Sequence, residues 1–246
     1  MKLFGLTDVG LVRRDNQDSY AIRKLDDDLA IAVVCDGMGG ALAGNVASAV
    51  AVEAFAAALE DACREGLPAD REHTMGLLQH ACQCANAQVF SLSAHNEEYR
   101  GMGTTLVGAL ILAREVYIIN VGDSRCYLLH EGILKQVTRD HSVVQTLLNA
   151  GSITPEQAKN HPKKHFITRA VGIESTVEGD LYVFDRTPGD TLLLCSDGLS
   201  NMLDEAALAA PLAAYDEPEL CCRKLLADAV EQGATDNVTV VTAKLS

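Results

Sequence analysis

Residues Ile31–Gly44 have the sequence IAVVCDGMGGALAG, which holds both the clearest strand signal and the first chemical signal of this 246-residue chain. The five apolar residues Ile31–Cys35 are typical of a buried strand, and they end at Asp36. Three glycines follow within four residues, before an alanine-rich helical pattern begins. A strand end that delivers a carboxylate into a glycine-rich turn can gather side-chain and main-chain oxygens around one point. Hard divalent cations require such oxygen ligands.

Taken alone, this stretch is more typical of a plain strand-to-helix turn, and the order Asp-Gly-x-Gly-Gly matches neither a Walker loop nor a dinucleotide fingerprint. The motif type recurs, however, because Asp197 closely follows the apolar run Thr191–Cys195 and precedes a glycine. Asp123 and Asp236 also lie in turns of small residues beside strand-like runs. Converging carboxylates repel one another unless a cation lies between them. All-oxygen ligation, without His or Cys in the motifs, favours Mg²⁺ or Mn²⁺ over zinc.

The chain has 20 basic and 34 acidic residues, a formal net charge of −14 at pH 7. Nucleic acids and anionic membranes bind basic surfaces, so this charge argues against both as partners. Met1–Leu11 lacks the apolar stretch of a signal peptide, and no apolar run approaches the ~18 residues of a membrane span. We therefore expect a soluble, cytoplasmic protein. The eight cysteines form no C-x-x-C pair, which favours reduced, structural thiols.

Apolar periodicity predicts blocks of strands and helices rather than regular alternation. The expected strands are Leu3–Val12, Tyr20–Lys24, Leu29–Cys35, Thr105–Ala113, Val116–Val121, Arg125–His130, Ile133–Val137, Glu178–Asp185, Thr191–Cys195 and Val238–Leu245. The expected helices are Ala43–Glu65, Thr74–Ser93, Ser142–Ala150, Glu205–Tyr215 and Pro218–Gln232. Gly66, Pro68 and Asp70 separate the first two helices.

This order excludes a doubly wound parallel fold. The short links between strands predict hairpins, and hence antiparallel sheets with helices packed outside them, an α+β class. Because no repeat or linker interrupts the pattern, residues 1–246 are expected to form one domain. A polar segment at about residues 150–165 begins near Gly151 and contains a helix start at Thr154-Pro155. We expect this segment to leave the sandwich as a mobile flap.

Arg13 offers a fixed, bidentate donor for an oxyanion such as phosphate. With the aspartate turns, it makes the chain resemble the PP2C-type metal-dependent serine/threonine protein phosphatases, particularly their short bacterial members. The matching motifs, in the family's order, are RRDNQD (13–18), VCDGMGG (34–40), GMGTT (101–105), GDSR (122–125), LCSDG (194–198) and TDNVT (235–239).

The resemblance implies a four-layer α-β-β-α sandwich, in which two antiparallel sheets are flanked by helix pairs and a two-metal centre lies at one end. It implies that Asp36 bridges two Mn²⁺ or Mg²⁺ ions. Asp197 and Asp236 would complete the first metal site, and the Gly37 carbonyl would serve the second.

The resemblance also implies that Arg13 holds the substrate phosphate and that Asp123, with Asp197, helps to bind a third, weaker ion. Two metal ions roughly 3.5–4 Å apart can hold a shared water as hydroxide and cancel phosphate charge. That hydroxide is expected to attack the phosphorus of phosphoserine or phosphothreonine in line, with no covalent enzyme intermediate.

Two positions depart from the family pattern. Many members have Glu where this chain has Gln17, so the second metal site is expected to rely more on Asp18 and water. Eukaryotic relatives have His, a proposed proton donor, where this chain has Met38, as short bacterial members often do. The general acid is therefore unassigned. Water on a metal is one candidate, and His161 in the flap is another, although a surface histidine is its simpler interpretation.

The leading hypothesis is a phosphoprotein phosphatase. The resemblance implies phosphorylated proteins as partners, among them an opposing bacterial Ser/Thr kinase, and a monomeric enzyme. A catalytically weak pseudophosphatase that binds phosphoproteins or senses metal is the main alternative, and Gln17 is its support. A two-metal nuclease is disfavoured by the charge of −14, because such enzymes need a basic track for the nucleic-acid backbone.

Overall fold

A computed structural model of the chain describes residues 1–40, 43–66 and 70–246. Pro68, expected to separate two helices, and part of the stretch Ile31–Gly44 lie outside the described residues.

The strands are β1 Lys2–Asp8, β2 Asp18–Lys24, β3 Ala30–Met38, β4 Gly103–Thr104, β5 Leu106–Ile111, β6 Glu115–Val121, β7 Arg125–His130, β8 Ile133–Gln136, β9 Asp180–Asp185, β10 Thr191–Cys195 and β11 Val238–Lys244. The helices are α1 Ala43–Glu65, α2 Arg71–His95, a 3₁₀ turn Glu97–Tyr99, α3 Val143–Asn149, α4 Pro155–Lys159, α5 Asp197–Ser200, α6 Glu205–Ala214 and α7 Pro218–Glu231.

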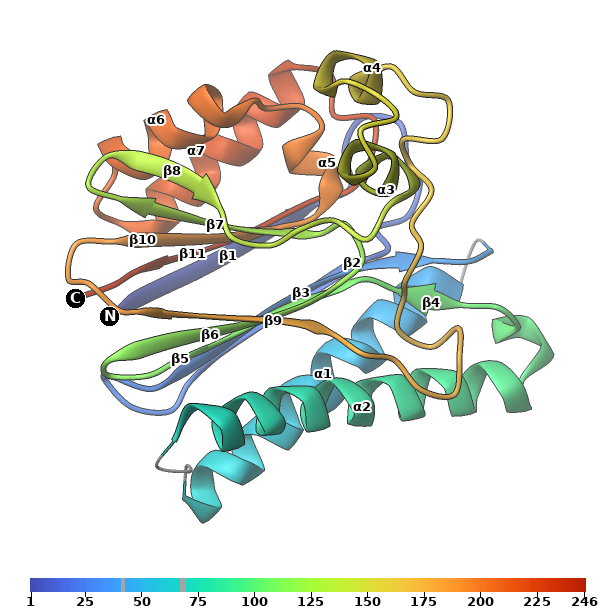
Figure 1. The fold of residues 1–246 in the computed structure, drawn as a ribbon, viewed down its shortest axis with the longest axis horizontal. Helices are drawn as coiled ribbons and strands as arrows, with labels where there is room; N and C mark the ends of the chain where they lie inside the picture. Colours follow the sequence, from blue (N-terminus) through green and yellow to red (C-terminus); the bar gives the residue numbers. More distant parts are fainter. Residues whose placement is uncertain (41–42, 67–69) are drawn as a thin grey trace.

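Two antiparallel sheets lie face to face between helices, as Figure 1 shows. One sheet has the order β1-β11-β10-β7-β8, and the other β2-β3-β5-β6-β9, with β4 beside β3. Every pair among these strands is antiparallel. Helices α1 and α2 cover the second sheet, and α6 and α7 cover the first. This arrangement confirms the expected α-β-β-α sandwich.

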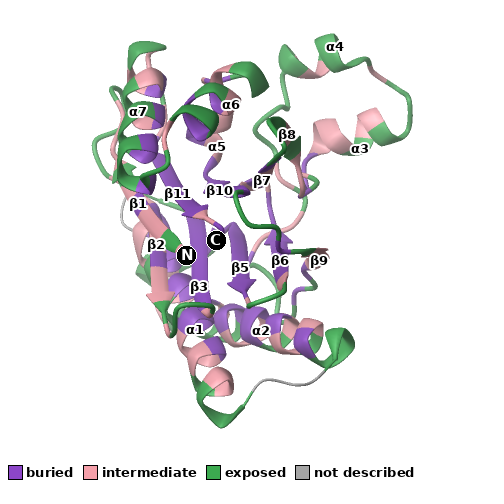
Figure 2. Ribbon diagram, turned by 90° about the vertical axis from the view of Figure 1, so that its left-hand side faces the viewer, coloured by how far each residue is buried: buried purple, intermediate pink, exposed green. Residues whose placement is uncertain are grey.

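Strand β3 is apolar on both faces because each face packs against a different layer. Ile31 and Val33 join a core with Phe55 of α1, whereas Ala32 and Val34 join a core that lies between the sheets. Figure 2 shows the buried positions on the sheets and on the helix faces turned toward them. A strand buried on both faces has a continuous apolar run in its sequence, and Ile31–Cys35 is such a run.

The main differences from expectation lie at strand ends. The first strand ends at Asp8 rather than Val12, because Gly10 turns the chain with φ +74° and donates its amide to Asp8 Oδ1 at 2.8 Å. The strand expected from Thr105 begins at Leu106, because the amide and hydroxyl of Thr105 bond to the backbone of Asp36. Helix α2 begins three residues earlier than expected, where the Asp70 side chain accepts from the His73 amide.

The segment around residues 150–165 lies apart from the sandwich and contains α4, as the yellow trace in Figure 1 shows. Gly151 ends α3 with φ +65°, and Thr154 and Gln157 form a capping box around α4. We call residues 150–165 the flap. In the described residues, no helix is long and apolar enough to cross a membrane.

Candidate active site

A cavity of about 660 Å³ lies at one end of the sandwich and brings together most of the residues that the sequence singled out. Its lining includes Arg13, Gln17, Asp36, Gly37, Met38, Asp123, Asp197 and Asp236. These residues come from the loops and strand ends of both sheets. The aspartate turns therefore converge on one cavity, as expected, although they are far apart in sequence.

Asp36 is held in place by the threonines of the GMGTT motif. Its amide donates to Thr105 Oγ1 at 2.8 Å, and its carbonyl accepts from the Thr105 amide and from Thr104 Oγ1, both at 2.9 Å. Thr105 Oγ1 also lies 2.7 Å from Ser124 Oγ, in the turn that contains Asp123. These bonds join three separate motifs into one support for the carboxylates.

Gly37 occupies a position where no side chain fits. A Cβ there would lie 1.9 Å from the Gly44 carbonyl oxygen and 2.7 Å from that of Gln17. The Gly37 amide donates to the Gln17 carbonyl at 3.0 Å, and the Gln17 amide group lies against Gly44. The RRDNQD loop is therefore packed directly onto the turn after Asp36.

A second close backbone approach brings Asp197 and Asp236 into the same cavity. Asp197 begins α5, and a Cβ on the next residue, Gly198, would lie 1.9 Å from the Asn237 carbonyl oxygen. Glycine at 198 thus allows the two acidic turns to pack against each other. Asn201 Nδ2 donates to Asp197 Oδ2 at 3.0 Å, and the Asn237 amide donates to Asp236 Oδ1 at 2.9 Å.

Asn237 also holds the loop that presents Arg13. Its Nδ2 donates to the carbonyls of Val9 and Asp15 at 3.0 and 3.1 Å, and its Oδ1 accepts from the Gln17 amide at 2.8 Å. Arg13 then reaches Asp236, with Nη2 2.7 Å from Oδ2. This hydrogen bond and the charge of Asp236 raise the pKa of Arg13, so the guanidinium is a permanent cation at the cavity edge.

Asp18 is the most buried carboxylate of the group, at 6 % exposed. It faces Asp36 in the register of β2 and β3. Its Oδ2 accepts from the hydroxyls of Ser196 and Thr239, both at 2.7 Å, while its Oδ1 is buried with no hydrogen-bond partner among the described residues. Asp18 itself does not line the cavity; it is a buried carboxylate on the strand beside the one that carries Asp36.

The electrostatics of the cavity fit a hard cation. Burial raises the pKa of Asp36, and the charges of Asp18 and Asp197 raise it further. Burial and the charge of Asp236 likewise raise the pKa of Asp197, whose Oδ1 has no partner among the described residues. Crowded carboxylates with free oxygens favour either protonation or a divalent ion, and the acidic side chains of the cavity offer only oxygen ligands.

The acidic side chains line the cavity without closing around a single point. Among the described residues, no group of three His, Cys, Asp or Glu side chains forms a ready ion cage. Arg13 and Asn201 instead bond to Asp236 and Asp197. A cation bound at Asp236 Oδ2 or Asp197 Oδ2 would compete with these two bonds.

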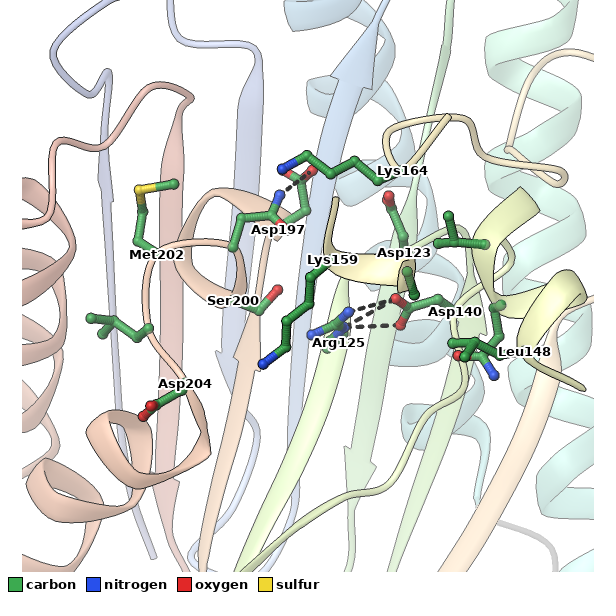
Figure 3. A pocket seen from close by; sticks show the side chains of 15 residues that line it. Asp123, Arg125, Asp140, Leu148, Lys159, Lys164, Asp197, Ser200, Met202 and Asp204 are labelled. Atoms are coloured by element: carbon green, nitrogen blue, oxygen red, sulfur yellow. Dashed lines mark hydrogen bonds and ion pairs between the residues drawn. The ribbon is translucent and has the colours of Figure 1, made fainter. Parts of the chain in front are cut away.

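A smaller cavity of about 410 Å³ shares Asp123 and Asp197 with the first, and it lies beneath the flap, as Figure 3 shows. Lys159 and Lys164 enter it from the flap. Its wall contains Arg125, which donates three hydrogen bonds to Asp140: Nε to Oδ1 at 2.9 Å and to Oδ2 at 3.2 Å, and Nη2 to Oδ2 at 2.7 Å.

The flap histidine that lines the cavity of about 660 Å³ is His165, which the sequence motifs did not single out. His161 lines neither of these two cavities, and its Nδ1 accepts from the Lys163 amide at 3.1 Å. Gly151 lies at the far end of the flap segment and also lines neither. The supporting roles of Thr105 and Asn237 were missed as well, although both lie inside the motifs. Their small polar side chains next to acidic turns were the available signal.

Comparison with known proteins agrees with this geometry. A family model for protein phosphatase 2C matches residues 13–220. The serine/threonine phosphatase Stp of Listeria monocytogenes serotype 4b is 41 % identical over 238 residues, covering 96 % of this chain and 92 % of that protein. The Mycobacterium tuberculosis phosphatase PstP is 39 % identical over 241 residues, which cover 96 % of this chain and 43 % of PstP.

Solved structures show the same fold. A crystal structure of Mycobacterium tuberculosis PstP superposes with a TM-score of 0.88 at 35 % identity, covering 100 % of this chain and 98 % of that one. The catalytic domain of a PstP in complex with two manganese ions superposes with a TM-score of 0.85 at 34 % identity, covering 99 % and 97 %. Because its motifs match the family model and its fold matches these phosphatases, the chain belongs to the protein phosphatase 2C family.

Proposed function

We propose that this chain removes phosphate from phosphoserine and phosphothreonine of proteins with the help of two Mn²⁺ or Mg²⁺ ions. The observation that supports this proposal is the convergence of Asp36, Asp197 and Asp236 with Arg13 in one cavity. Converging carboxylates without a cation destabilise one another, and a guanidinium beside them is suited to an oxyanion.

Asp36 would contact both ions, Asp197 and Asp236 would complete the first site, and the Gly37 carbonyl would serve the second. Asp18 would support the second site through its free Oδ1. Gln17 lines the cavity and can offer only an amide oxygen there. Asp123, which lines both cavities, would hold a third and weaker ion with Asp197.

The metal pair, when bound, supplies an activated water and neutralises charge on the phosphoryl group. Arg13 binds the phosphate oxygens and orients the phosphorus toward the carboxylates. Thr105 keeps the backbone at Asp36 fixed during this process, and Asn237 keeps the loop that presents Arg13 fixed. Met38 has no proton to donate and His161 lies outside the cavity, so water and His165 are the candidate proton donors for the leaving oxygen.

The proposal also covers the substrates of the enzyme, its oligomeric state and its location in the cell. The substrates would be phosphorylated proteins, and an opposing Ser/Thr kinase would be among them. The net charge of −14 disfavours nucleic acid and anionic membranes as partners. We propose a monomer in the cytoplasm, with residues 1–246 as one domain and the flap as its mobile part.

The test is phosphate release from a phosphothreonine peptide in Mn²⁺, Mg²⁺ or EDTA, with a phosphotyrosine peptide beside it. We expect activity with Mn²⁺ that EDTA abolishes and that favours phosphothreonine. Asp36→Asn should lose at least about 100-fold in kcat/KM, since replacing even a group that orients a metal ligand costs 10–100-fold. Full metal-dependent activity of Asp36→Asn would contradict the proposal.

Gln17 favours a second candidate, a weakly active phosphoprotein-binding module. A folded wild-type protein that binds the phosphothreonine peptide but stays inactive with every metal would support it. Activity gained by Gln17→Glu would then locate the defect in the second metal site.

A further inference from the structure

The cavity of about 660 Å³ that Arg13 and the aspartates line is called the catalytic cavity. A third cavity, of about 510 Å³, continues from it along the edge of the sandwich. Met38 and Ile167 line both cavities, so the two form one continuous surface. The wall beyond them is the chain that leaves the flap and runs down to α2, which Figure 1 shows as the yellow-to-orange trace. We call this cavity the edge groove and define it by Met38, Ile167, Arg169, Ile173, Glu174 and Glu178.

The groove presents apolar side chains beside an otherwise acidic site. Ile173 is 46 % exposed. Its Cδ1 and the Met38 Cε both lie against Gly103, where an added Cβ would be 2.8 and 2.9 Å from them. Val12, at 66 % exposed, lines the catalytic cavity itself. Exposed apolar side chains gathered around a catalytic cavity mark a contact surface.

The exposure of Ile173 is built into the fold. Asn86 of α2 is fully buried, and its Oδ1 accepts from the Gly172 amide at 2.7 Å while its Nδ2 donates to the Glu174 carbonyl at 3.0 Å. One buried side chain thus clamps the residues on both sides of Ile173. Gly172 has φ +87° and approaches Val89 so closely that a Cβ would be 2.2 Å from its Cγ1.

The rest of the segment is anchored to the same helix. Gln79 Nε2 donates to the Val177 carbonyl at 3.1 Å, and Gln79 Oε1 accepts from the Gly179 amide at 3.1 Å. Gln83 also donates to the Val177 carbonyl. A wall fixed in this way loses little conformational entropy when it binds a ligand, so it is suited to recognition.

The far end of the groove is acidic. Arg169 is neutralised, since its Nη1 donates to Asp180 Oδ1 at 2.7 Å and to the Glu178 carbonyl at 2.8 Å. The carboxylates of Glu174 and Glu178 lie on the exposed rim and form no ion pair with a described residue. A basic group would complement them.

We propose that the edge groove binds the part of a phosphoprotein substrate next to its phosphoresidue. An apolar side chain of the substrate packs on Ile173, and a basic side chain beyond it meets Glu174. The inference rests on the proposed phosphatase function and adds to it a preference for substrate sequence. The occupant is an extended peptide segment, because the groove is continuous with the cavity that Arg13 lines, and the chain on either side of a phosphoresidue has to leave that cavity.

The test uses peptides in which a phosphothreonine is flanked by alanine and serine. A single leucine is placed in turn at each of the three positions before and the three positions after the phosphothreonine. We expect leucine at the position that meets the groove to raise kcat/KM of the wild type about tenfold, equivalent to about 1.4 kcal/mol. Ile173→Ser should remove this preference and leave hydrolysis of p-nitrophenyl phosphate, which has no flanking residues, unchanged. Ile133→Ser, at an isoleucine of β8 that is 72 % exposed, is the matched control and should keep it.

A lysine placed one or two residues beyond the preferred leucine should raise kcat/KM further in the wild type but not in Glu174→Lys. This second variant tests the groove without altering its apolar part. Equal kcat/KM for all leucine peptides and the alanine peptide would overturn the inference. The inference would also be overturned if Ile173→Ser lowered kcat/KM by the same factor for the preferred leucine peptide and for p-nitrophenyl phosphate.

Failure of the proposed function can be told apart from failure of the inference. A wild type that does not hydrolyse p-nitrophenyl phosphate with Mn²⁺ would contradict the phosphatase function. The groove is then judged by fluorescence anisotropy with labelled peptides. Tighter binding of the preferred leucine peptide, lost in Ile173→Ser, would support it, and equal Kd values for leucine and alanine peptides would overturn it.

Discussion

Arg13 Nη2 lies 2.7 Å from Asp236 Oδ2, so the guanidinium proposed to hold substrate phosphate is bonded to a carboxylate proposed to hold metal. The side chains are 53 % and 36 % exposed, and ion pairs of this kind contribute little net stability. The bond can therefore open at small cost when a cation binds to Asp236. If the two residues have the proposed roles, metal binding and release of Arg13 toward the phosphate are expected to be coupled.

The first prediction follows from this bond. Arg13→Ala should lower kcat/KM for a phosphothreonine peptide about 10- to 100-fold, mainly through KM, because a charge-assisted contact with the phosphate is lost. The Kd for Mn²⁺, measured by calorimetry, should stay the same or fall, since Asp236 is freed. Arg13→Lys keeps the charge but not the bidentate geometry, and should recover only part of the loss. A rise in the Kd for Mn²⁺ with unchanged KM would reverse the assigned role.

The second prediction concerns Gln17, whose amide group lies in the cavity against Gly44. Gln17→Glu places another carboxylate beside the second metal site. The Mn²⁺ concentration for half-maximal activity should fall by about tenfold, equivalent to about 1.4 kcal/mol. Gln17→Ala, which removes the amide oxygen, should shift it in the opposite direction. Identical metal titrations for all three proteins would exclude position 17 from the site.

The third prediction separates Asp123 from the tight metal pair. Asp123→Ala should leave the tightest Mn²⁺ binding seen by calorimetry unchanged, while the part of the activity that needs millimolar-range Mn²⁺ is lost. The reason is that Asp123 lies in the region shared by both cavities, together with Asp197. Ser200→Ala serves as the control, because Ser200 also lines the cavity of about 410 Å³ beneath the flap. An activity titration that matches the wild type throughout would remove Asp123 from metal binding.

The fourth prediction concerns pH and a site away from catalysis. His130 Nδ1 lies 2.8 Å from Asp190 Oδ1, and this contact raises the pKa of His130 in the folded state. The stabilisation is fully present below the ordinary histidine pKa of about 6.5 and is lost as pH rises through the folded value. His130→Gln should therefore lower Tm more at pH 5.5 than at pH 8.5. An equal loss of Tm at the two pH values would contradict this role of the His130–Asp190 contact.

Most of the architecture could be predicted from sequence because the strands are strongly apolar and the motifs lie at their ends. Ile31–Cys35 is an example, since its continuous apolar run required cover on both faces. The end of β1 could not be predicted, because the strand pattern runs on past Gly10, and the Asp236 turn that packs against Gly10 is not its neighbour in the sequence. That contact joins residues more than two hundred positions apart.

The site was predicted as a set of residues but not as a network. Motif matching selected Asp36 and Arg13, yet the bonds from Thr105 to Asp36 and from Asn237 to the loop that presents Arg13 depend on tertiary packing. The edge groove had no sequence signal at all. The residues of its wall lack helix or strand periodicity. Asn86, whose side chain bonds to this wall, is typical in sequence of a solvent-facing polar residue on an amphipathic helix.

Asp18 has a consequence for how the enzyme is made and lost. It belongs to β2 of one sheet, but its Oδ2 is held by Ser196 and Thr239 at the ends of β10 and β11 of the other. The carboxylates of the site come from both sheets, so the cavity exists only where the two sheets are packed together. We therefore expect phosphatase activity to appear during folding only once the sheets have packed, and to be lost when they separate.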